Sequence, residues 1–466
     1  MTRISFGGRT IRGSGVDYQR RRLIGTASVV AIFWVSIGVI LTFAFGIYPL
    51  HGGGFPVIPR PPYTRSYDPI TVVEQGLPPN VPVDTARLRD APKDVSIQLL
   101  ALRPGGVTLV AGGRPVRYIA TPAPVTEIGE LCDLVADRNW IERSGPRQVA
   151  LKSALVVYPG VELTIGGASV DDLVLLNRIG TFIGANGGGL NFERIRVHVA
   201  SAVPQSMDRY RPFILAIGQG VMRFHNTVVD GLGWDWNGSY GVSWQDGSTG
   251  EAVDTTFENS FIGVYTARSS GLLFRRCVFR KNYLYGFDPH TYSRKIVVDE
   301  SLAEGNGAHG FIFSEYVRES VIMNSTSRGN GENGIMMDRY STGNLIHNNT
   351  VTGNRGDGIV TADSPRNSFH SNVIRENRVG VKTSPRDARS TIFEANKVVF
   401  NNIASEDLKV ANGQGGNTVM GNGGQWNTHA LRMVWSGIAA ALLISVVLLS
   451  VHARKWRSKA LRHAVS

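Results

Sequence analysis

The 466-residue chain is long enough for two or three ordinary domains or for one long repetitive domain. Its 54 glycines lack the strict period of collagen, and a hydrophobic content of 42% excludes a largely disordered chain. The net charge of +12 lies mostly in two tails, because residues 1–22 hold six arginines and one aspartate and residues 453–466 hold five basic residues without an acid. Only about +2 remains between them (12 − 5 − 5), so a nucleic-acid partner is not expected.

Two apolar runs adjoin these basic tails. Residues 23–50 read LIGTASVVAIFWVSIGVILTFAFGIYPL, and residues 433–452 begin MVWSGIAAALLISVVLLSV. A bilayer core needs about 20 apolar residues, so both runs predict transmembrane helices. A cleaved signal peptide is the alternative for the first run, but it is long and lacks an A-x-A-like cleavage site. Because the basic clusters lie outside both runs, both termini are expected in the cytoplasm and the intervening domain on the periplasmic or extracellular side of the cell membrane.

Between the membrane runs the composition changes several times. A Pro-rich stretch predicts an extended linker, after which two short β-type runs (VSIQLLAL and GVTLVAG) and a short amphipathic helix near Glu127–Ala136 predict a cap over the N-terminal end of the next region. That next region holds only short β-type runs separated by Gly and Asn. The predicted segments are a linker at 51–92, a capping region at 93–150, a repetitive β domain at 151–412 and a second linker at 413–432.

The β domain is an internal repeat. Intervals of 22, 23, 24, 24, 24 and 22 residues separate seven glycines, namely Gly241, Gly263, Gly286, Gly310, Gly334, Gly358 and Gly380. A period this short without helices is typical of the coils of a parallel β-helix, which stack at about 4.8 Å so that equivalent residues form ladders. The expected inward apolar ladder is Phe287, Phe311, Ile335, Ile359 and Val381, and the expected amide ladder is Asn282, Asn306, Asn330 and Asn354. The predicted fold is therefore all-β, a parallel β-helix solenoid with a short N-terminal cap, flanked by two transmembrane helices.

One coil departs from the repeat. The stretch YGFDPHTYS holds Tyr285, Asp288 and His290 within six residues. Because side chains alternate across a strand, an inward Phe287 places Asp288 and His290 together on the outer face. The repeat registers Ser314 and Asp338 with His290, and places His309 in the ladder of Tyr285. An imidazole, a carboxylate and a phenol along one groove suit general acid–base chemistry, although a surface turn of polar residues is the alternative.

The segment YGFDPH resembles the signature of mannuronan C5-epimerases, and the similarity continues through DESLAEGNGAHGF and MMDRYSTGNLIHNNTVTGNRGDGI. GSYGVSW and ALVVYPGVEL resemble the periplasmic type more closely, over roughly residues 155–381. The resemblance implies a right-handed parallel β-helix that inverts C5 of mannuronate within a polymer to give guluronate. It implies His290 as the base that takes the C5 proton, Tyr285 as the proton donor on the opposite face, and Asp288 as the supporting acid.

The chain also departs from that family's pattern. Glu315 stands where the periplasmic type has an arginine, Ser314 stands where the secreted type has an aspartate, and Thr291 replaces an acidic residue. The group that neutralises the substrate carboxylate is therefore unassigned; Arg339 is the first substitute and Arg294 a weaker one. The candidate substrate-binding residues are Arg339, Asp338, His309, Ser314, Glu315 and Arg294.

Other motifs carry less information. Cys132 and Cys277 either form a disulfide or remain two buried thiols. The sequence contains no zinc-type Cys/His spacing, Walker loop, H-E-x-x-H motif or calcium-binding repeat, so no metal or cofactor is expected. His347 and His370 are expected to be structural. The tryptophans of GLGWDWNGSYGVSWQDG either stack on sugar rings or pack locally.

Three functions follow from these observations. The first is a membrane-anchored polyuronate C5-epimerase, an isomerase whose partners are a mannuronan-like polymer, the membrane and possible polysaccharide synthase or export machinery. The second is a polyuronate lyase, which shares the proton abstraction but then eliminates the 4-O-linked chain. The third is a non-catalytic glycan-binding β-helix of the cell envelope, suggested by the missing cation at Glu315.

Overall fold

The computed structural model describes residues 98–200, 210–235, 238–405, 410 and 413–422. The chain divides into two compact units, Met1–Ser66 and Tyr67–Ser466, and all described residues belong to the second. The predicted membrane segments at 23–50 and 433–452, both basic tails and the 51–92 linker lie outside the described residues. Within the described ranges, no helix has the length and apolar character needed to cross a bilayer.

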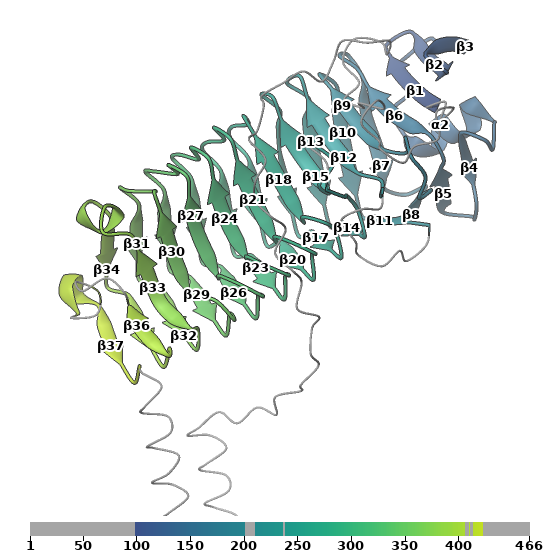
Figure 1. The fold of residues 1–466 in the computed structure, drawn as a ribbon. Coiled ribbons are helices and arrows are strands. Elements are labelled where there is room, and N and C mark those ends of the chain that lie inside the picture. The colour runs from purple at the N-terminus through teal and green to yellow at the C-terminus, as the bar shows by residue number, and fades with distance from the viewer. Residues whose placement is uncertain (1–97, 201–209, 236–237, 406–409, 411–412, 423–466) are drawn as a thin grey trace, which may run out of the picture. The chain divides into compact units, whose positions relative to one another are not determined.

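Three long sheets run along the described domain, and from β6 to β35 successive strands belong to the three sheets in turn (Figure 1). We name them sheets A, B and C. Apart from antiparallel pairs at the N-terminal end, all pairings are parallel, as the repeat predicted.

The 14 strands of sheet A, in spatial order, are β3 (Arg114–Ala120), β2 (Gly106–Ala111), β1 (Gln98–Arg103), β6 (Ala154–Val157), β9 (Ile183–Asn186), β12 (Ile214–Ile217), β15 (Val242–Gln245), β18 (Val264–Ala267), β21 (Phe287–His290), β24 (Phe311–Ser314), β27 (Ile335–Asp338), β30 (Ile359–Ala362), β33 (Val379–Thr383) and β36 (Ile403–Ser405). The 10 strands of sheet B are β34 (Ile392–Glu394), β31 (Ser368–His370), β28 (Leu345–His347), β25 (Val321–Met323), β22 (Val297–Asp299), β19 (Leu273–Arg275), β16 (Thr249–Val253), β13 (Val221–His225), β10 (Gly189–Glu193) and β7 (Glu162–Gly166). The 13 strands of sheet C are β37 (Thr418–Met420), β35 (Lys397–Val399), β32 (Val373–Arg375), β29 (Thr350–Thr352), β26 (Thr326–Arg328), β23 (Leu302–Glu304), β20 (Val278–Arg280), β17 (Thr256–Glu258), β14 (Val228–Asp230), β11 (Arg196–Val199), β8 (Asp172–Leu175), β5 (Gln148–Leu151) and β4 (Ile141–Arg143).

Short helices lie at both ends of the solenoid. Helix α2 (Ile128–Val135) coincides with the predicted amphipathic helix, and it packs its buried Ile128, Leu131 and Val135 against the first coils. Two 3₁₀ helices of the described residues, η2 (Asp387–Arg389) and η3 (Gln414–Gly416), lie near the C-terminal end. Strand β37 pairs with β35, so the parallel strands continue to Met420, inside the segment assigned above to a linker.

The predicted ladders are confirmed in register. Phe287, Phe311, Ile335, Ile359 and Val381 are consecutive partners along sheet A and are all buried in one core. The amide ladder is also present, since each Nδ2 donates to the Oδ1 of the next asparagine at 2.8–2.9 Å from Asn282 to Asn354. It continues beyond the predicted end to Asn422.

The repeat glycines are required by close approach between coils. A Cβ on Gly310 would lie 2.2 Å from the Ser327 Oγ and 2.7 Å from the Asn330 Nδ2. Because real Cβ atoms do not approach other atoms so closely, only glycine can start this strand beside the asparagine ladder.

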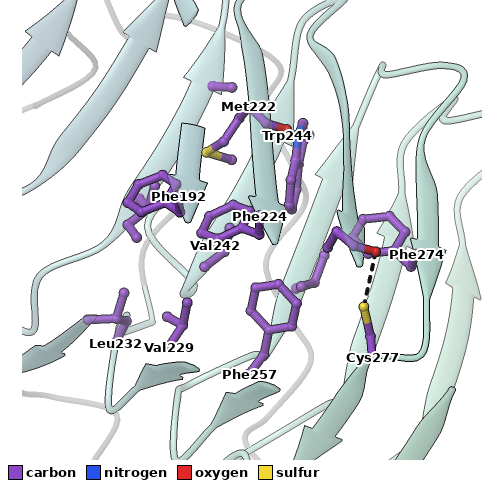
Figure 2. Close-up of a cluster of buried hydrophobic side chains, with 14 of the residues drawn as sticks. Phe192, Met222, Phe224, Val229, Leu232, Val242, Trp244, Phe257, Phe274 and Cys277 are labelled. Atoms are coloured by element: carbon purple, nitrogen blue, oxygen red, sulfur yellow. Dashed lines mark hydrogen bonds between the residues drawn. The ribbon is translucent and has the colours of Figure 1, made fainter. Parts of the chain in front are cut away.

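The interior is rich in aromatic side chains. Trp244 is fully buried, packs edge-on against Phe274 at 5.3 Å, and donates from Nε1 to the Met222 carbonyl. Figure 2 shows it among the phenylalanines of this core, so Trp244 is structural and does not stack on sugars. Cys277 lies in the same core, where its thiol donates to the Ala252 carbonyl. Both cysteines are free and buried, which excludes the disulfide.

Candidate active site

The candidate site lies on the outer face of sheet A, over β18, β21, β24 and β27. The register pairs Tyr265 with Asp288 and Ala267 with His290. It also pairs Ser314 with Asp338, as the repeat predicted. Because Phe287 fills the interior, strand alternation directs Asp288 and His290 to the opposite face.

His290 is nearly buried and has an ordered set of partners. Its Nδ1 lies 2.6 Å from the Thr291 Oγ1 and 3.5 Å from the Glu315 Oε2, and the Thr291 hydroxyl donates to that Glu315 oxygen at 3.1 Å. Since the Thr291 hydroxyl donates to Glu315, its oxygen accepts a hydrogen bond from the Nδ1–H of His290. This assignment leaves the lone pair of the neutral ring on Nε2.

Burial lowers the pKa of His290 to about 4, and the nearby negative charge of Glu315 only partly opposes this effect. The ring is therefore uncharged at neutral pH. One of its neighbours is Tyr265, whose ring centroid lies 5.6 Å away. A neutral imidazole with its Nδ1–H held by a hydroxyl–carboxylate relay is competent to accept a proton.

Asp288 is a buried carboxyl group. Its side chain is 3% exposed, and its Oδ1 has no hydrogen-bond partner among the described residues. Burial raises the pKa of Asp288 well above its ordinary value, and the negative charges of Asp338 and Glu315 raise it further, against the opposing effect of Arg339. The raised pKa favours the neutral, protonated form of Asp288, and a protonated carboxyl group can donate a hydrogen bond.

Arg339 is engaged by one carboxylate of its own coil, Asp338, and by one of the preceding coil, Glu315. Its Nη1 donates to the Glu315 Oε1 at 2.9 Å, and its Nε lies 3.5 Å from the Asp338 Oδ2. Asp338 also accepts a hydrogen bond from the Ser314 hydroxyl at 3.3 Å, and burial raises the pKa of Asp338. The guanidinium that the sequence offered as the neutralising cation is thus already paired.

Tyr285 lies in the turn before β21 and belongs to a second, smaller environment. Its ring stacks on His309 with centroids 5.2 Å apart and an angle of 3° between the planes. The His309 Nδ1 accepts a hydrogen bond from the Asn333 backbone N–H at 3.2 Å, and its Nε2 lies 3.5 Å from the Glu332 carboxylate. These contacts fix the ring that supports the phenol.

An apolar cluster covers this part of the outer face. It consists of Tyr240, Phe261, Ile262, Tyr265, Ala267, Tyr285, Ala308 and Ile312. Sequence reasoning missed Tyr265, although it precedes Asp288 by one repeat of 23 residues. The role of Thr291 as the link between His290 and Glu315 was also missed; the two linked positions are one 24-residue repeat apart.

The nine predicted site residues fall into three groups. His290, Glu315, Arg339, Asp338 and Ser314 form one connected set of polar contacts, and Asp288 lies beside it in the same electrostatic environment. Tyr285 and His309 form the stacked pair. Arg294 stands apart in an exposed row after β21, bridged by backbone pairing to Arg318.

Comparisons with known proteins identify relatives of this chain and support its fold. Residues 214–424 match a family model described as the right handed beta helix region. Mannuronan C5-epimerase AlgG of Azotobacter vinelandii is 28% identical over 212 residues, which is 42% of this chain and 40% of that protein. The Pseudomonas aeruginosa mannuronan C5-epimerase is 28% identical over 183 residues, covering 35% and 33%. The chain is homologous to mannuronan C5-epimerases.

A solved structure is also similar to this fold. The crystal structure of the periplasmic alginate epimerase AlgG superposes with a TM-score of 0.56 at 24% identity, covering 60% of this chain and 69% of that chain. At this identity the superposition supports the right-handed solenoid fold. The chain spans less than half the length of the two curated epimerases it matches.

Proposed function

We propose that this chain is a polyuronate C5-epimerase that converts mannuronate to guluronate residues within a polymer. The observation that carries the proposal is His290, a neutral imidazole held by the Thr291–Glu315 relay beside the buried carboxyl group of Asp288, whose pKa is raised. Homology to mannuronan C5-epimerases supports the reaction and the substrate class.

In the proposed mechanism, Nε2 of His290 removes the C5 proton of a mannuronate residue. The resulting carbanion is stabilised only when the neighbouring carboxylate is neutralised. Arg339 is already paired with Glu315 and Asp338, so we assign this role to the proton of Asp288, which donates a hydrogen bond to the substrate carboxylate. Tyr285 returns a proton to C5 from the opposite face, which completes the inversion.

Exchange of the C5 hydrogen tests this function. Poly-mannuronate is incubated with the protein in heavy water, and deuterium at C5 and guluronate content are followed by proton NMR. Wild-type protein should introduce both, and His290→Ala should abolish both. His347→Ala is the matched control, because His347 lies on sheet B away from the site and should leave exchange unchanged.

The same incubation distinguishes the other candidate functions. A polyuronate lyase would generate unsaturated chain ends, detected by their ultraviolet absorbance, without guluronate. A glycan-binding protein would bind the polymer and leave its composition unaltered. Either result, obtained with folded wild-type protein, would refute the epimerase proposal.

We further propose that the domain is anchored in the cell membrane through residues 23–50 and 433–452, with both termini in the cytoplasm. The uncharged runs and their flanking basic clusters support this arrangement. Such an anchor would hold the site where a polymer leaves a synthase or export machinery. Carbonate extraction of membranes should leave the full-length chain in the pellet, and release into the supernatant would refute the anchor.

A further inference from the structure

Three tyrosines form a stacked row beside the candidate site. Tyr292, Tyr316 and Tyr340 occupy equivalent positions in the turns that follow β21, β24 and β27. Their ring centroids are 4.8 Å and 5.3 Å apart, and the ring planes differ by 10° and 20°. We name this set the tyrosine row. The three tyrosines directly follow Thr291, Glu315 and Arg339, which belong to the polar contacts around His290, so the row borders the site.

The backbone of the tyrosine row is unusual for bulky residues. The φ angles of Tyr292, Tyr316 and Tyr340 are 58°, 67° and 65°, a region in which large side chains are rare. Three residues separate His290 from Arg294 in this coil, whereas two separate Ala267 from Ser270 in the preceding coil. The turn after β21 therefore has one residue more than the turn after β18, and it contains the exposed Tyr292.

Packing into the core does not account for these side chains. Tyr292 is 59% exposed and Tyr340 is 44% exposed. Positive φ alone does not mark a functional position, because many coil turns of this solenoid have it, including the turn at Phe400; exposure together with stacked rings beside the site distinguishes the row. Stacking between coils is the structural alternative, and the experiment below separates the two.

The chemistry of the row suits an anion. Because the ring faces are turned toward one another, the ring edges, which carry partial positive charge, and the hydroxyls remain for a ligand. No hydrogen bond of these three hydroxyls occurs within the described part of the chain. The exposed Arg294 and Arg318 lie in adjacent coils immediately beyond the row and are bridged through their backbones.

We propose that the tyrosine row, together with Arg294 and Arg318, is a binding track for a polyuronate chain that continues from the candidate active site along the solenoid axis. The hydroxyls and ring edges contact sugar hydroxyls and carboxylates, and the guanidinium groups pair with carboxylates. The track rests on the proposed function for its ligand, because that function makes an acidic polysaccharide the substrate. The experiments below also test whether a neutral glycan binds the track equally well, which would contradict the proposal.

Two sets of variants of the full-length chain test the track. The triple variant Y292F/Y316F/Y340F keeps the rings and their stacking but removes the hydroxyls. It should raise KM for long poly-mannuronate about tenfold with kcat unchanged, and should leave the midpoint of thermal unfolding unchanged. The effect should shrink as the oligomer is shortened, because a short substrate occupies only the reacting position.

The second set uses an internal control. Asparagine tolerates positive φ, so Tyr292→Asn removes the side chain without adding backbone strain. Phe400→Asn is the matched control, since Phe400 is 55% exposed with a φ of 56° but lies after sheet C strand β35. Tyr292→Asn should weaken binding of fluorescently labelled mannuronate oligomers about tenfold, and Phe400→Asn should not.

Binding and turnover are measured separately so that the two proposals fail separately. Unchanged oligomer binding by the tyrosine variants, with C5 exchange intact, would overturn the track and leave the epimerase function. Equal competition by neutral dextran would also overturn it. Tyrosine-dependent oligomer binding by a wild-type protein that exchanges no C5 hydrogen would support the track and overturn the epimerase function.

Discussion

The protonation state of Asp288 makes the sharpest prediction from this structure. In the fold, burial and two neighbouring carboxylates raise the pKa of Asp288 above its ordinary value of 3.8. Asp288→Asn replaces the acid with a neutral group of nearly the same shape that still donates a hydrogen bond. If Asp288 is protonated in the native protein, the variant and the wild type should have similar free energies of unfolding at low pH. At higher pH the variant should be the more stable of the two.

The magnitude follows from proton linkage. The folded chain holds the Asp288 proton to a higher pH than the unfolded chain does, so the folded state binds more protons between the two pKa values. The free energy of unfolding of the wild type therefore falls as pH rises, by about 1.4 kcal/mol for each pH unit between them. The stabilising contribution is complete below the unfolded pKa and is lost as pH rises through the folded pKa. The asparagine variant lacks this slope.

The assay is thermal or denaturant unfolding of the wild type and Asp288→Asn in parallel from pH 4 to pH 8. All other titrations are shared, so the difference between the two proteins reports on Asp288. The difference should grow in favour of the variant as pH rises, and Asp288→Asn should retain more C5 exchange than Asp288→Ala. A difference that stays constant across this range would show an ordinary ionised carboxylate and refute the assigned role.

Three further predictions concern the relay, the amide ladder and the core. Glu315→Gln removes the negative charge that raises the pKa of His290, so the acid limb of the exchange rate against pH should move to lower pH. Asn330→Ala leaves buried partners of its ladder amide unsatisfied and should cost about 2–5 kcal/mol in unfolding experiments, whereas the exposed Asn348→Ala should change stability by less than about 0.5 kcal/mol. Burial raises the pKa of the Cys277 thiol to about 12, so maleimide should label it only after unfolding; labelling of the native protein would contradict the buried position.

The solenoid could be predicted because its stabilising contacts repeat in the sequence. A ladder places the same residue type one period apart, so the Phe287 series and the Asn282 series were visible as intervals and are confirmed in register. The interior position of Trp244 followed the same alternation, because Val242 and Trp244 lie on one face of β15, but an irregular Gly-rich context obscured it.

The environment of the site could not be predicted in the same way. Strand alternation placed Asp288 and His290 on the outer face, yet it could not show that an apolar cluster would bury them there. That cluster draws Tyr240 and Phe261 from turns of preceding coils, which the alternation of side chains along a strand does not describe. The pKa shifts of Asp288 and His290 depend on this burial, so their directions could not be predicted from the sequence.

Glu315 is the residue that most departs from the resemblance, and its contacts give the departure a physical meaning. An arginine there would add a cation to the site. Glutamate instead binds Arg339, accepts the Thr291 hydroxyl that orients His290, and contributes to the negative field that raises the pKa of Asp288. In the proposed mechanism the charge of the substrate carboxylate is therefore met by a proton on Asp288, and the glutamate that displaces the cation also helps to keep that proton in place.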